Sequence, residues 1–416
     1  MTAATEPPPR IATLDIVRGI AVMGILAMNI IAFAMPFQAY LNPMAYGIES
    51  GADLASWAFS YVFIDGKMRG LFSFLFGASM LLVIERAEGS GASPASIHYR
   101  RMFWLLAFGL LHFYFIWFGD ILAMYAQVGM IAFLFRKLSA RALVRWGIGL
   151  VFVQLLIFGG LTVMTFLLQT ALSQPNPSAE YVAQWQEMQG QMGVIGGPAL
   201  AEKLALFTGP WTGQVEHRLA DAWEPFVGTL FFGWETLGYF LFGMAAFKSG
   251  FLRGEWADER YRRTALIGFG VGIPAYAAMA AIALNDGFSM PVLMATVMAG
   301  PVLFRPLMVI GIAALIILIT RRGGGLVERI AAAGRAAFTN YLGTSILMTA
   351  LFYGWGAGLY GSMSRIELWV VVIAMWALML IWSKPWLERF RYGPFEWLWR
   401  TLARWQVQPM RKPQPA

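Results

Sequence analysis

The chain has 416 residues, of which 58% are apolar and only 13% are charged. Soluble domains carry roughly 25% charged residues, so this composition indicates a surface that faces lipid. The absence of Cys excludes disulfides and thiolate metal sites, and a total of three His argues against a His-rich metal centre. The net charge of +8 does not indicate a nucleic-acid partner, because the cations lie in short segments between apolar runs.

Apolar stretches long enough to cross a membrane recur along the whole sequence. They predict an all-α fold, namely a polytopic integral membrane protein with about ten transmembrane helices. The expected spans lie at 16–36, 54–84, 102–118, 121–135, 146–172, 226–247, 264–284, 291–320, 336–353 and 367–383.

Two of these stretches are interrupted. The charged residues of 65–69 divide the stretch 54–84, which predicts either a kinked span or a short helix followed by a span. The stretch 291–320 contains Pro301 and Pro306, so it is expected to span only in its second half.

The positions of the Lys and Arg residues give the orientation independently of the helix count. When the N-terminus is placed in the cytoplasm, 25 of the 31 Lys and Arg residues fall on the cytoplasmic side. Cytoplasmic loops of membrane proteins carry such an excess of positive charge. Both termini are therefore predicted to be cytoplasmic.

The predicted organisation has five parts. They are a cytoplasmic N-terminus at 1–15, transmembrane helices within 16–172, an extracytoplasmic segment at 173–225, further transmembrane helices within 226–384 and a cytoplasmic tail at 385–416. The segment 173–225 either caps a site or is a plain connector. The tail is rich in Trp and Arg, which is typical of an amphipathic helix at the membrane surface.

Polar residues inside a span are costly in hydrocarbon, so each is a candidate site residue. In the first span Asn29 lies about 20° around the helix from Arg18, Asp15 lies about 60° away on the other side, and Asn29 is about 16 Å above Arg18. This stripe predicts a cavity that leads from a cytoplasmic ion pair to a buried amide. The alternative is an ion pair that ends the helix and an Asn that holds a neighbouring helix.

A second group consists of Asp65, Lys67, Arg69 and Ser73, ahead of Gly77. The charged members face either water or a partner helix, and a surface turn explains them equally well. They are candidates for binding a substrate or cofactor. The spacing of Ser73 and Gly77 also predicts close helix packing.

The third group is His112 with Asp120. His112 lies within an apolar run, about 18 Å along the helix from Arg100, and Asp120 begins the next run at a tight outer turn. This pattern indicates a general base or a proton relay, although a buried packing His is the structural alternative. Asp120 either orients a substrate or caps a helix. His98 and His217 are expected to be solvated in loops.

Five separated motifs resemble those of the YeiB-like bacterial membrane proteins. They are LDIVRGIA at 14–21 with Asn29, DGK at 65–67 with the LFSFLFG run that follows, His112 with WFGDIL at 117–122, GR at 334–335 with TNYL at 339–342, and YGPFEWLWR at 392–400. The C-terminal half is similar to the domain of unknown function of that family. The resemblance implies a multi-pass protein of the bacterial inner membrane, and it adds Arg335 and Asn340 to the candidate binding residues.

The N-terminal half is also similar to the transmembrane acyltransferase superfamily that includes heparan-α-glucosaminide acetyltransferase. That resemblance implies transfer of an acyl group, acetyl above all, from cytoplasmic acyl-CoA to an extracytoplasmic acceptor, and it carries a catalytic role onto Asn29. The loop His that follows the first helix in that superfamily has no counterpart between Pro36 and Ser60, so His112 takes its place as the expected base.

The leading hypothesis is a membrane-embedded acyltransferase. Arg18, Arg100 and Arg101 would bind the phosphates of acyl-CoA, Asn29 the thioester carbonyl, and His112 with Asp120 would activate the acceptor. No tightly bound cofactor or metal is expected. The partners are the lipid bilayer and a small-molecule or glycan acceptor, with a homodimer as one candidate assembly.

Two alternatives stay open at this point. One is a transporter that uses the same polar pathway and a proton relay at His112. The other is a lipid-binding scaffold or sensor, indicated by the Trp-rich tail.

Overall fold

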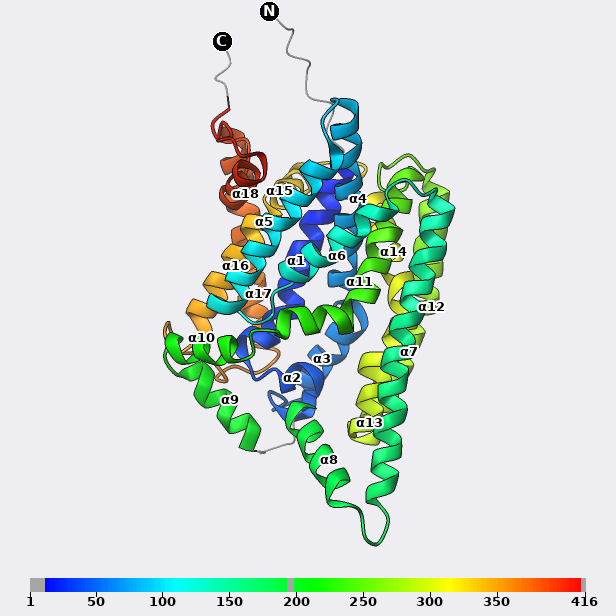
Figure 1. Cartoon of the computed structure of the whole chain (residues 1–416), viewed down its shortest axis with the longest axis vertical. Coiled ribbons are helices and arrows are strands. Elements are labelled where there is room, and N and C mark those ends of the chain that lie inside the picture. Colours follow the sequence, from blue (N-terminus) through cyan, green and yellow to red (C-terminus); the bar gives the residue numbers. More distant parts are fainter. Residues whose placement is uncertain (1–11, 193–197, 413–416) are drawn as a thin grey trace, which may run out of the picture.

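The structure of the chain is a computed structural model that describes residues 12–192 and 198–412. Three parts of the chain lie outside this description: residues 1–11, residues 193–197 within the segment 173–225, and residues 413–416. The described residues form helices joined by short connections, and β-type pairing is confined to one isolated bridge between Phe390 and Arg411 (Figure 1). The all-α prediction is confirmed.

The helices follow one another along the chain in a fixed order. They are α1 (Ala12–Ala34), α2 (Gln38–Leu41), η1 (Pro43–Ala45), α3 (Gly51–Phe63), α4 (Lys67–Gly89), α5 (Pro94–Phe115), α6 (Leu122–Ala132), η2 (Phe133–Phe135), α7 (Ala140–Leu172), α8 (Ala179–Met192), α9 (Pro198–Thr208), α10 (Trp211–Ala220), α11 (Glu224–Lys248), α12 (Asp258–Asp286), α13 (Met290–Leu293), the π-helix η3 (Met294–Ala299), α14 (Gly300–Thr320), α15 (Gly325–Arg335), α16 (Ala337–Phe352), α17 (Leu368–Arg389) and α18 (Pro394–Arg404).

Seven helical segments of the described chain are long and apolar enough to cross a membrane. They are Ala12–Ala34, Gly51–Gly89, Ala140–Leu172, Glu224–Lys248, Asp258–Asp286, Met290–Thr320 and Leu368–Arg389. The three other stretches expected to span correspond to α5, α6 with η2, and α16. α6 and α16 are short, and α5 carries Arg100, Arg101 and His112, which lower its mean hydropathy.

Both interrupted stretches are resolved by local backbone geometry. At the first, α3 ends at Phe63 and α4 begins at Lys67, with Gly66 between them at φ +70, a conformation that glycine adopts without strain. This is the short helix followed by a longer one. The second is helical over its whole length, and a π-helical stretch directly before Pro301 accommodates the missing proline amide.

α1 lies at the centre of the molecule, with 78% of its most apolar window buried, whereas α7, α12 and α17 bury only 22%, 33% and 28%. The exposed face of α7 consists of large apolar side chains such as Ile148, Phe152 and Leu156. An apolar surface of this extent is typical of helices that contact lipid.

The inner helices approach one another closely at glycines. A Cβ added to Gly77 would lie 2.1 Å from the carbonyl oxygen of Phe240, and one added to Gly243 would lie 1.8 Å from that of Phe74. These contacts bring α4 and α11 together, so the close packing predicted at Gly77 is confirmed. Gly334 allows the same approach of α15 to α1, where an added Cβ would lie 1.9 Å from the carbonyl oxygen of Asp15.

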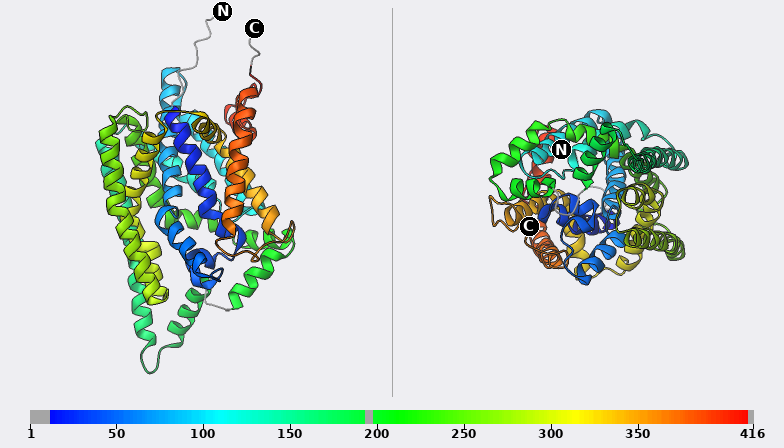
Figure 2. Two further views of the ribbon diagram at one scale, coloured as in Figure 1. Left: turned by 180° about the vertical axis from the view of Figure 1, so that it is seen from behind. Right: turned by 90° about the horizontal axis from the view of Figure 1, so that it is seen from below.

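The connections sort to two ends of the molecule (Figures 1 and 2). The start of α1, the α4–α5 connection, α15 and α18 gather at one end, which we call the α18 end. α2, α3, α8 and α9 lie at the opposite end, which we call the α8 end. The segment 173–225 folds into α8, α9 and α10, and α10 holds the end of α5 through a hydrogen bond from Trp211 Nε1 to Phe115 O (2.8 Å).

Candidate functional site

His112 and Asp120 form a buried pair near the end of α5. The Nδ1 atom of His112 lies 2.7 Å from Oδ2 of Asp120, and each side chain is only 1% exposed. The other carboxylate oxygen of Asp120 accepts a hydrogen bond from the backbone amide of Ala123 (2.8 Å) in the first turn of α6. Asp120 therefore orients His112 and also caps a helix. A carboxylate at Nδ1 holds the proton there and leaves Nε2 free to accept another.

The remaining ring nitrogen of His112 has no hydrogen-bond partner among the described residues, although it is buried. The same holds for Nε1 of Trp117, whose ring centroid lies 6.3 Å from that of His112 and 3.9 Å from that of Phe33. Buried polar atoms are normally paired in proteins. Two unpaired polar atoms on neighbouring rings indicate a place where a ligand group supplies the missing partners.

Asn29 of α1 is a further predicted site residue close to Tyr341. Its side chain faces a small cavity of about 10 Å³ that Tyr341 and Thr344 also line, and no described residue hydrogen-bonds its amide. Thr344 Oγ1 is buried without a partner as well. The Tyr341 ring lies 5.4 Å from the His112 ring, and its hydroxyl accepts a hydrogen bond from the amide of Ile121 (3.2 Å). Unpaired polar atoms from α1, α5 and α16 thus surround one tyrosine.

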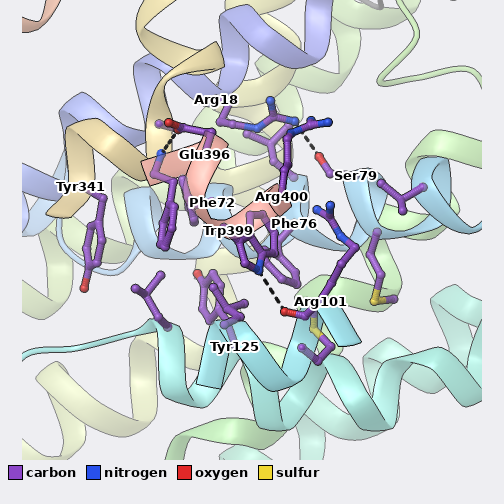
Figure 3. Close-up of a pocket in the computed structure, with 18 of the residues that line it drawn as sticks. Arg18, Phe72, Phe76, Ser79, Arg101, Tyr125, Tyr341, Glu396, Trp399 and Arg400 are labelled. Carbon is purple, nitrogen blue, oxygen red and sulfur yellow. Dashed lines mark hydrogen bonds between the residues drawn. The ribbon is translucent and has the colours of Figure 1, made fainter. Parts of the chain in front are cut away.

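A larger cavity of about 220 Å³ extends from α18 to the same tyrosine, and Figure 3 shows residues that line it. Four arginines from four helices line it, namely Arg18 of α1, Arg101 of α5, Arg335 of α15 and Arg400 of α18. Figure 3 shows the guanidinium groups of Arg18, Arg101 and Arg400 on one side of the cavity and Tyr341 on the opposite side. Its other walls are formed by aliphatic and aromatic side chains, and the aromatic ones include Phe72, Phe76, Tyr125, Phe338 and Trp399.

Specific contacts fix the arginines in place. Arg18 pairs with Asp15 (3.0 Å), as the sequence predicts, and donates a hydrogen bond to Ser79 Oγ (2.6 Å). The Arg101 guanidinium stacks on Trp399 at 4.1 Å from the ring centroid, and Trp399 Nε1 donates to the carbonyl of Arg101 (3.0 Å). Arg100 lies outside the cavity and donates to the carbonyl of Ser96. Of the two neighbouring arginines, only Arg101 faces the cavity.

Glu396 is the acidic residue in the wall of the cavity. Its carboxylate accepts hydrogen bonds from the amides of Phe338 (2.6 Å) and Thr339 (3.1 Å) and from the hydroxyl of Thr339 (2.5 Å), so it caps the start of α16. Burial raises the pKa of Glu396, and the hydrogen bonds from Thr339 oppose that rise only in part. Glu396 thereby ties α18 to the helix that carries Tyr341.

Asn340 does not line the cavity. Its amide donates to the carbonyl of Ala333 (3.0 Å) and to Ser383 Oγ (3.3 Å), and its oxygen accepts from Trp382 Nε1 (2.9 Å). These contacts join α16 to α15 and α17. The structure therefore gives Asn340 a packing role next to Tyr341.

The candidates at the start of α4 belong to a different polar cluster. The ammonium of Lys67 is fully buried, donates to the carbonyl of Tyr61 and lies over the Tyr276 ring. Arg69 pairs with Glu235 of α11 (2.8 Å), which Arg305 of α14 also binds. Neither cation faces the arginine-lined cavity.

Ser73 lies next to that cavity without lining it. Its hydroxyl lies 2.6 Å from that of Tyr125, and Tyr125 lines the cavity. Ser73 therefore orients a wall residue.

The solvated position expected for His98 is wrong. His98 lies within α5, is 2% exposed and hydrogen-bonds the carbonyl of Gly129 (2.9 Å). It is buried because Phe133 of η2 stacks on its ring (4.9 Å). His217 is exposed, as expected, but it lies in α10 rather than in a loop, and it contacts the Lys203 amine. Within residues 12–192 and 198–412, no three His, Asp or Glu side chains come together as a metal site would require.

Reasoning from single residues missed several groups of this site. Tyr341, Trp117 and Thr344 are uncharged, so nothing in their residue type indicates a site. Arg400 falls in the segment that the sequence predicts as a cytoplasmic tail. Tyr341, Trp117 and Arg400 nevertheless fall inside the motifs 339–342, 117–122 and 392–400. The motifs were therefore the signal that could have found them.

These features define an all-helical membrane protein with a buried His–Asp pair beside an arginine-lined cavity. A family described as "Protein of unknown function (DUF418)" matches residues 246–406. The chain is 32% identical to the uncharacterized protein YxaH of Bacillus subtilis (strain 168), over 97% of this chain and 96% of that protein. It is also 32% identical to the uncharacterized protein YeiB of Escherichia coli (strain K12), over 95% and 96%.

A third relative, an uncharacterized 39.9 kDa protein in the amylase 3' region of Bacillus acidopullulyticus, is 24% identical over 95% of this chain and 94% of that protein. The matches to YxaH and YeiB cover nearly the full length of this chain and of each relative. The chain therefore belongs to the YeiB-like family.

Proposed function

We propose that this protein is an acyltransferase that moves an acyl group from acyl-CoA, bound at the α18 end, to an acceptor that arrives from the α8 end. In this proposal the α18 end faces the cytoplasm of a bacterial cell and the protein crosses the inner membrane. The excess of Lys and Arg in the connections at that end supports the orientation. α5, α6 and α16 complete a set of about ten spans, enclosed by the longer helices.

One observation carries the proposal. A His whose Nδ1 is held by a carboxylate, and whose Nε2 is buried without a partner, lies against the ring of Tyr341. That same ring forms a wall of a cavity lined by four arginines. A histidine nitrogen without a partner and a cluster of guanidinium groups, which suit phosphates, thus meet at one residue.

The cavity matches the donor in charge, and its volume suits one part of the donor. The arginines supply bidentate donors for the phosphates of acyl-CoA. A volume of about 220 Å³ is below the roughly 300–1,000 Å³ typical of pockets that enclose a whole drug-sized ligand. We therefore assign the cavity to the pantetheine arm, which points its thioester toward Tyr341, while the nucleotide stays at the arginines.

The chemistry at the pair is a single acyl transfer. His112 Nε2 takes the proton from the acceptor hydroxyl or amine as the acceptor oxygen or nitrogen bonds to the thioester carbonyl carbon. The carbon–sulfur bond then breaks, and the CoA thiolate leaves with the proton returned from His112. Asp120 stays ionised and stabilises the imidazolium. The amide of Asn29 and the indole N–H of Trp117 are the donors available to the developing oxyanion.

Two neighbouring arginines provide a matched test of donor binding. In purified protein, we expect Arg101→Gln to weaken acetyl-CoA binding by about tenfold, as the loss of one charge-assisted contact predicts. Arg100→Gln removes the same charge one residue away, outside the cavity, and should leave binding unchanged. Equal effects of the two variants, or no binding by the wild type, would refute the assignment of the cavity.

The transfer step is tested with labelled acetyl-CoA and a cell-envelope extract. We expect His112→Gln to keep acetyl-CoA binding and to lower label transfer by roughly 10²–10⁴-fold, the usual contribution of a general base. His217→Gln serves as the control, because His217 is exposed in the segment 173–225. Transfer by the His112 variant at the wild-type rate would end the proposal.

Transport is the second candidate, and the buried charges of Glu235, Arg69 and Arg305 favour it. Ionisable groups inside spans mark solute pathways in many transporters. Proteoliposomes that exchange a solute without any acyl-CoA would decide for transport.

A further inference from the structure

Arg218 of α10 is a buried cation at the α8 end. It is 4% exposed, and its Nε donates to the carbonyl of Tyr114 on α5 (2.8 Å). Its Nη2 has no hydrogen-bond partner, and among the described residues no carboxylate lies within ion-pair distance of it. The guanidinium is therefore withdrawn from water without a compensating negative charge.

An arrangement of this kind is unfavourable. A buried charge is normally paired, because its removal from water is costly. A guanidinium presents a planar fork of donors that fits a carboxylate or a phosphate. The missing counter-charge is thus of the kind that a bound anion supplies.

Three further buried polar atoms without partners lie in the same region. They are Oε1 of Gln214 and the hydroxyls of Tyr353 and Tyr360. Phe207 of α9 connects them, since both tyrosine rings lie 5.0 Å from its ring and Gln214 Nε2 donates to its carbonyl (3.3 Å). Two hydroxyls and one amide oxygen suit a ligand that carries hydroxyl groups beside its anion.

This cluster borders the His–Asp pair. Arg218 is bonded to Tyr114, two residues after His112 on α5. Phe207 contacts Phe118 (5.7 Å between ring centroids), two residues before Asp120. A ligand held at Arg218 would therefore approach the pair from the side opposite the arginine-lined cavity.

We infer that Arg218, Gln214, Tyr353 and Tyr360 bind the acceptor, and that the acceptor is an anionic, hydroxyl-bearing molecule that carries a carboxylate or a phosphate. The inference rests on the proposed acyl transfer for the ligand's role as acceptor. Phe207 contacts both tyrosines and Gln214, so binding of a ligand to all four side chains requires the Phe207 ring to turn. The segment 173–225 then contributes a substrate-binding residue.

The test measures binding alone, so it does not depend on catalysis. The thermal midpoint of the full-length protein in detergent is recorded with glucose 6-phosphate, glucuronate or neutral glucose. We expect one or both anionic sugars to raise the midpoint by several degrees at a roughly hundredfold excess over Kd, and glucose to leave it unchanged. The phosphate and carboxylate probes separate the two sources of negative charge.

Variants assign the effect to Arg218. Arg218→Gln should weaken binding of the anionic sugar by about tenfold or more, and Arg218→Lys, which keeps the charge, should retain part of it. Lys203→Gln, which removes a cation in the same segment, should bind as the wild type does. A response to neither anionic sugar, an equal response to glucose, or unchanged binding by a folded Arg218→Gln protein would overturn the inference.

The outcome is separable from that of the proposed function. Acetyl-CoA binding reports on the cavity at the α18 end and is unaffected by Arg218→Gln. If the protein binds the anionic sugar through Arg218 but does not bind acetyl-CoA, the anion site is supported and acyl transfer is refuted.

Discussion

Glu235 is the residue whose loss should cost the most stability. It is 2% exposed in α11, and its carboxylate accepts two hydrogen bonds from Arg305 (2.7 and 2.8 Å) and one from Arg69 (2.8 Å). The three residues belong to α11, α14 and α4. Glu235→Gln keeps the size of the side chain but removes the only negative charge among the three.

The expected destabilisation follows from those contacts. The Gln oxygen can accept from one guanidinium, whereas its NH₂ group faces the other as a second donor. Hydrogen bonds to charged groups contribute about 1.5–3 kcal/mol each. Removing one partner of a buried ion pair typically costs about 3–5 kcal/mol, because an uncompensated charge is left behind. We therefore expect Glu235→Gln to lower the free energy of unfolding by about 3–5 kcal/mol.

The assay is reversible SDS unfolding of the purified protein, with thermal midpoints as a second measure. Glu224→Gln, on the exposed first turn of the same helix, is the control and should stay within about 0.5 kcal/mol of the wild type. Adding Arg69→Met to Glu235→Gln restores the net charge of the cluster, so the double variant should be more stable than the sum of the single effects by about 1–3 kcal/mol. A Glu235→Gln protein as stable as the Glu224 control would refute the reasoning and would indicate that water solvates the cluster.

Two further predictions concern packing and pH. Gly77→Ala should lower the free energy of unfolding by about 1–3 kcal/mol, because the added Cβ would lie 2.1 Å from the Phe240 carbonyl oxygen. Gly228→Ala, on the open face of α11, should be neutral or slightly stabilising. The thermal midpoints of the two variants check this. Burial raises the native pKa of Glu396, so the folded state holds its proton to higher pH than the unfolded state does, and stability should fall as pH rises from the ordinary value near 4.5 toward the raised value. Glu396→Gln cannot ionise and should flatten that part of the midpoint-against-pH curve, and an unchanged slope would contradict the pKa direction.

Features that depend on local spacing were predictable from the sequence. The Asp15–Arg18 ion pair follows from their positions one helical turn apart, and the structure has it at 3.0 Å. Close packing at Gly77 follows from a small residue in an apolar helix. The break before Lys67 follows from a glycine within a charged cluster. In each case the deciding interactions lie within a few residues of one another or depend on residue size.

Features assembled from distant segments could not be derived in this way. The contact of Arg69 with Glu235 joins residues 166 positions apart, and that of Arg305 with Glu235 joins residues 70 positions apart. No helical periodicity specifies which faces of α4, α11 and α14 meet. For the same reason Lys67 and Arg69 look like ligand-binding residues in the sequence, whereas in the fold their polar atoms are satisfied by the protein itself.

The His–Asp pair and the cavity differ in how they are built, and this difference bears on function. His112 and Asp120 are only eight positions apart, and the amides of Ile116 and Trp117 both bond the His112 carbonyl, so the turn itself returns the carboxylate to the ring. The cavity instead is lined by residues of seven helices, and Glu396 holds α18 on α16. Tyr341 is the contact between the two. In the proposed acyl transfer, the base is therefore preorganised by its own turn, whereas donor binding depends on the docking of α18 against α16.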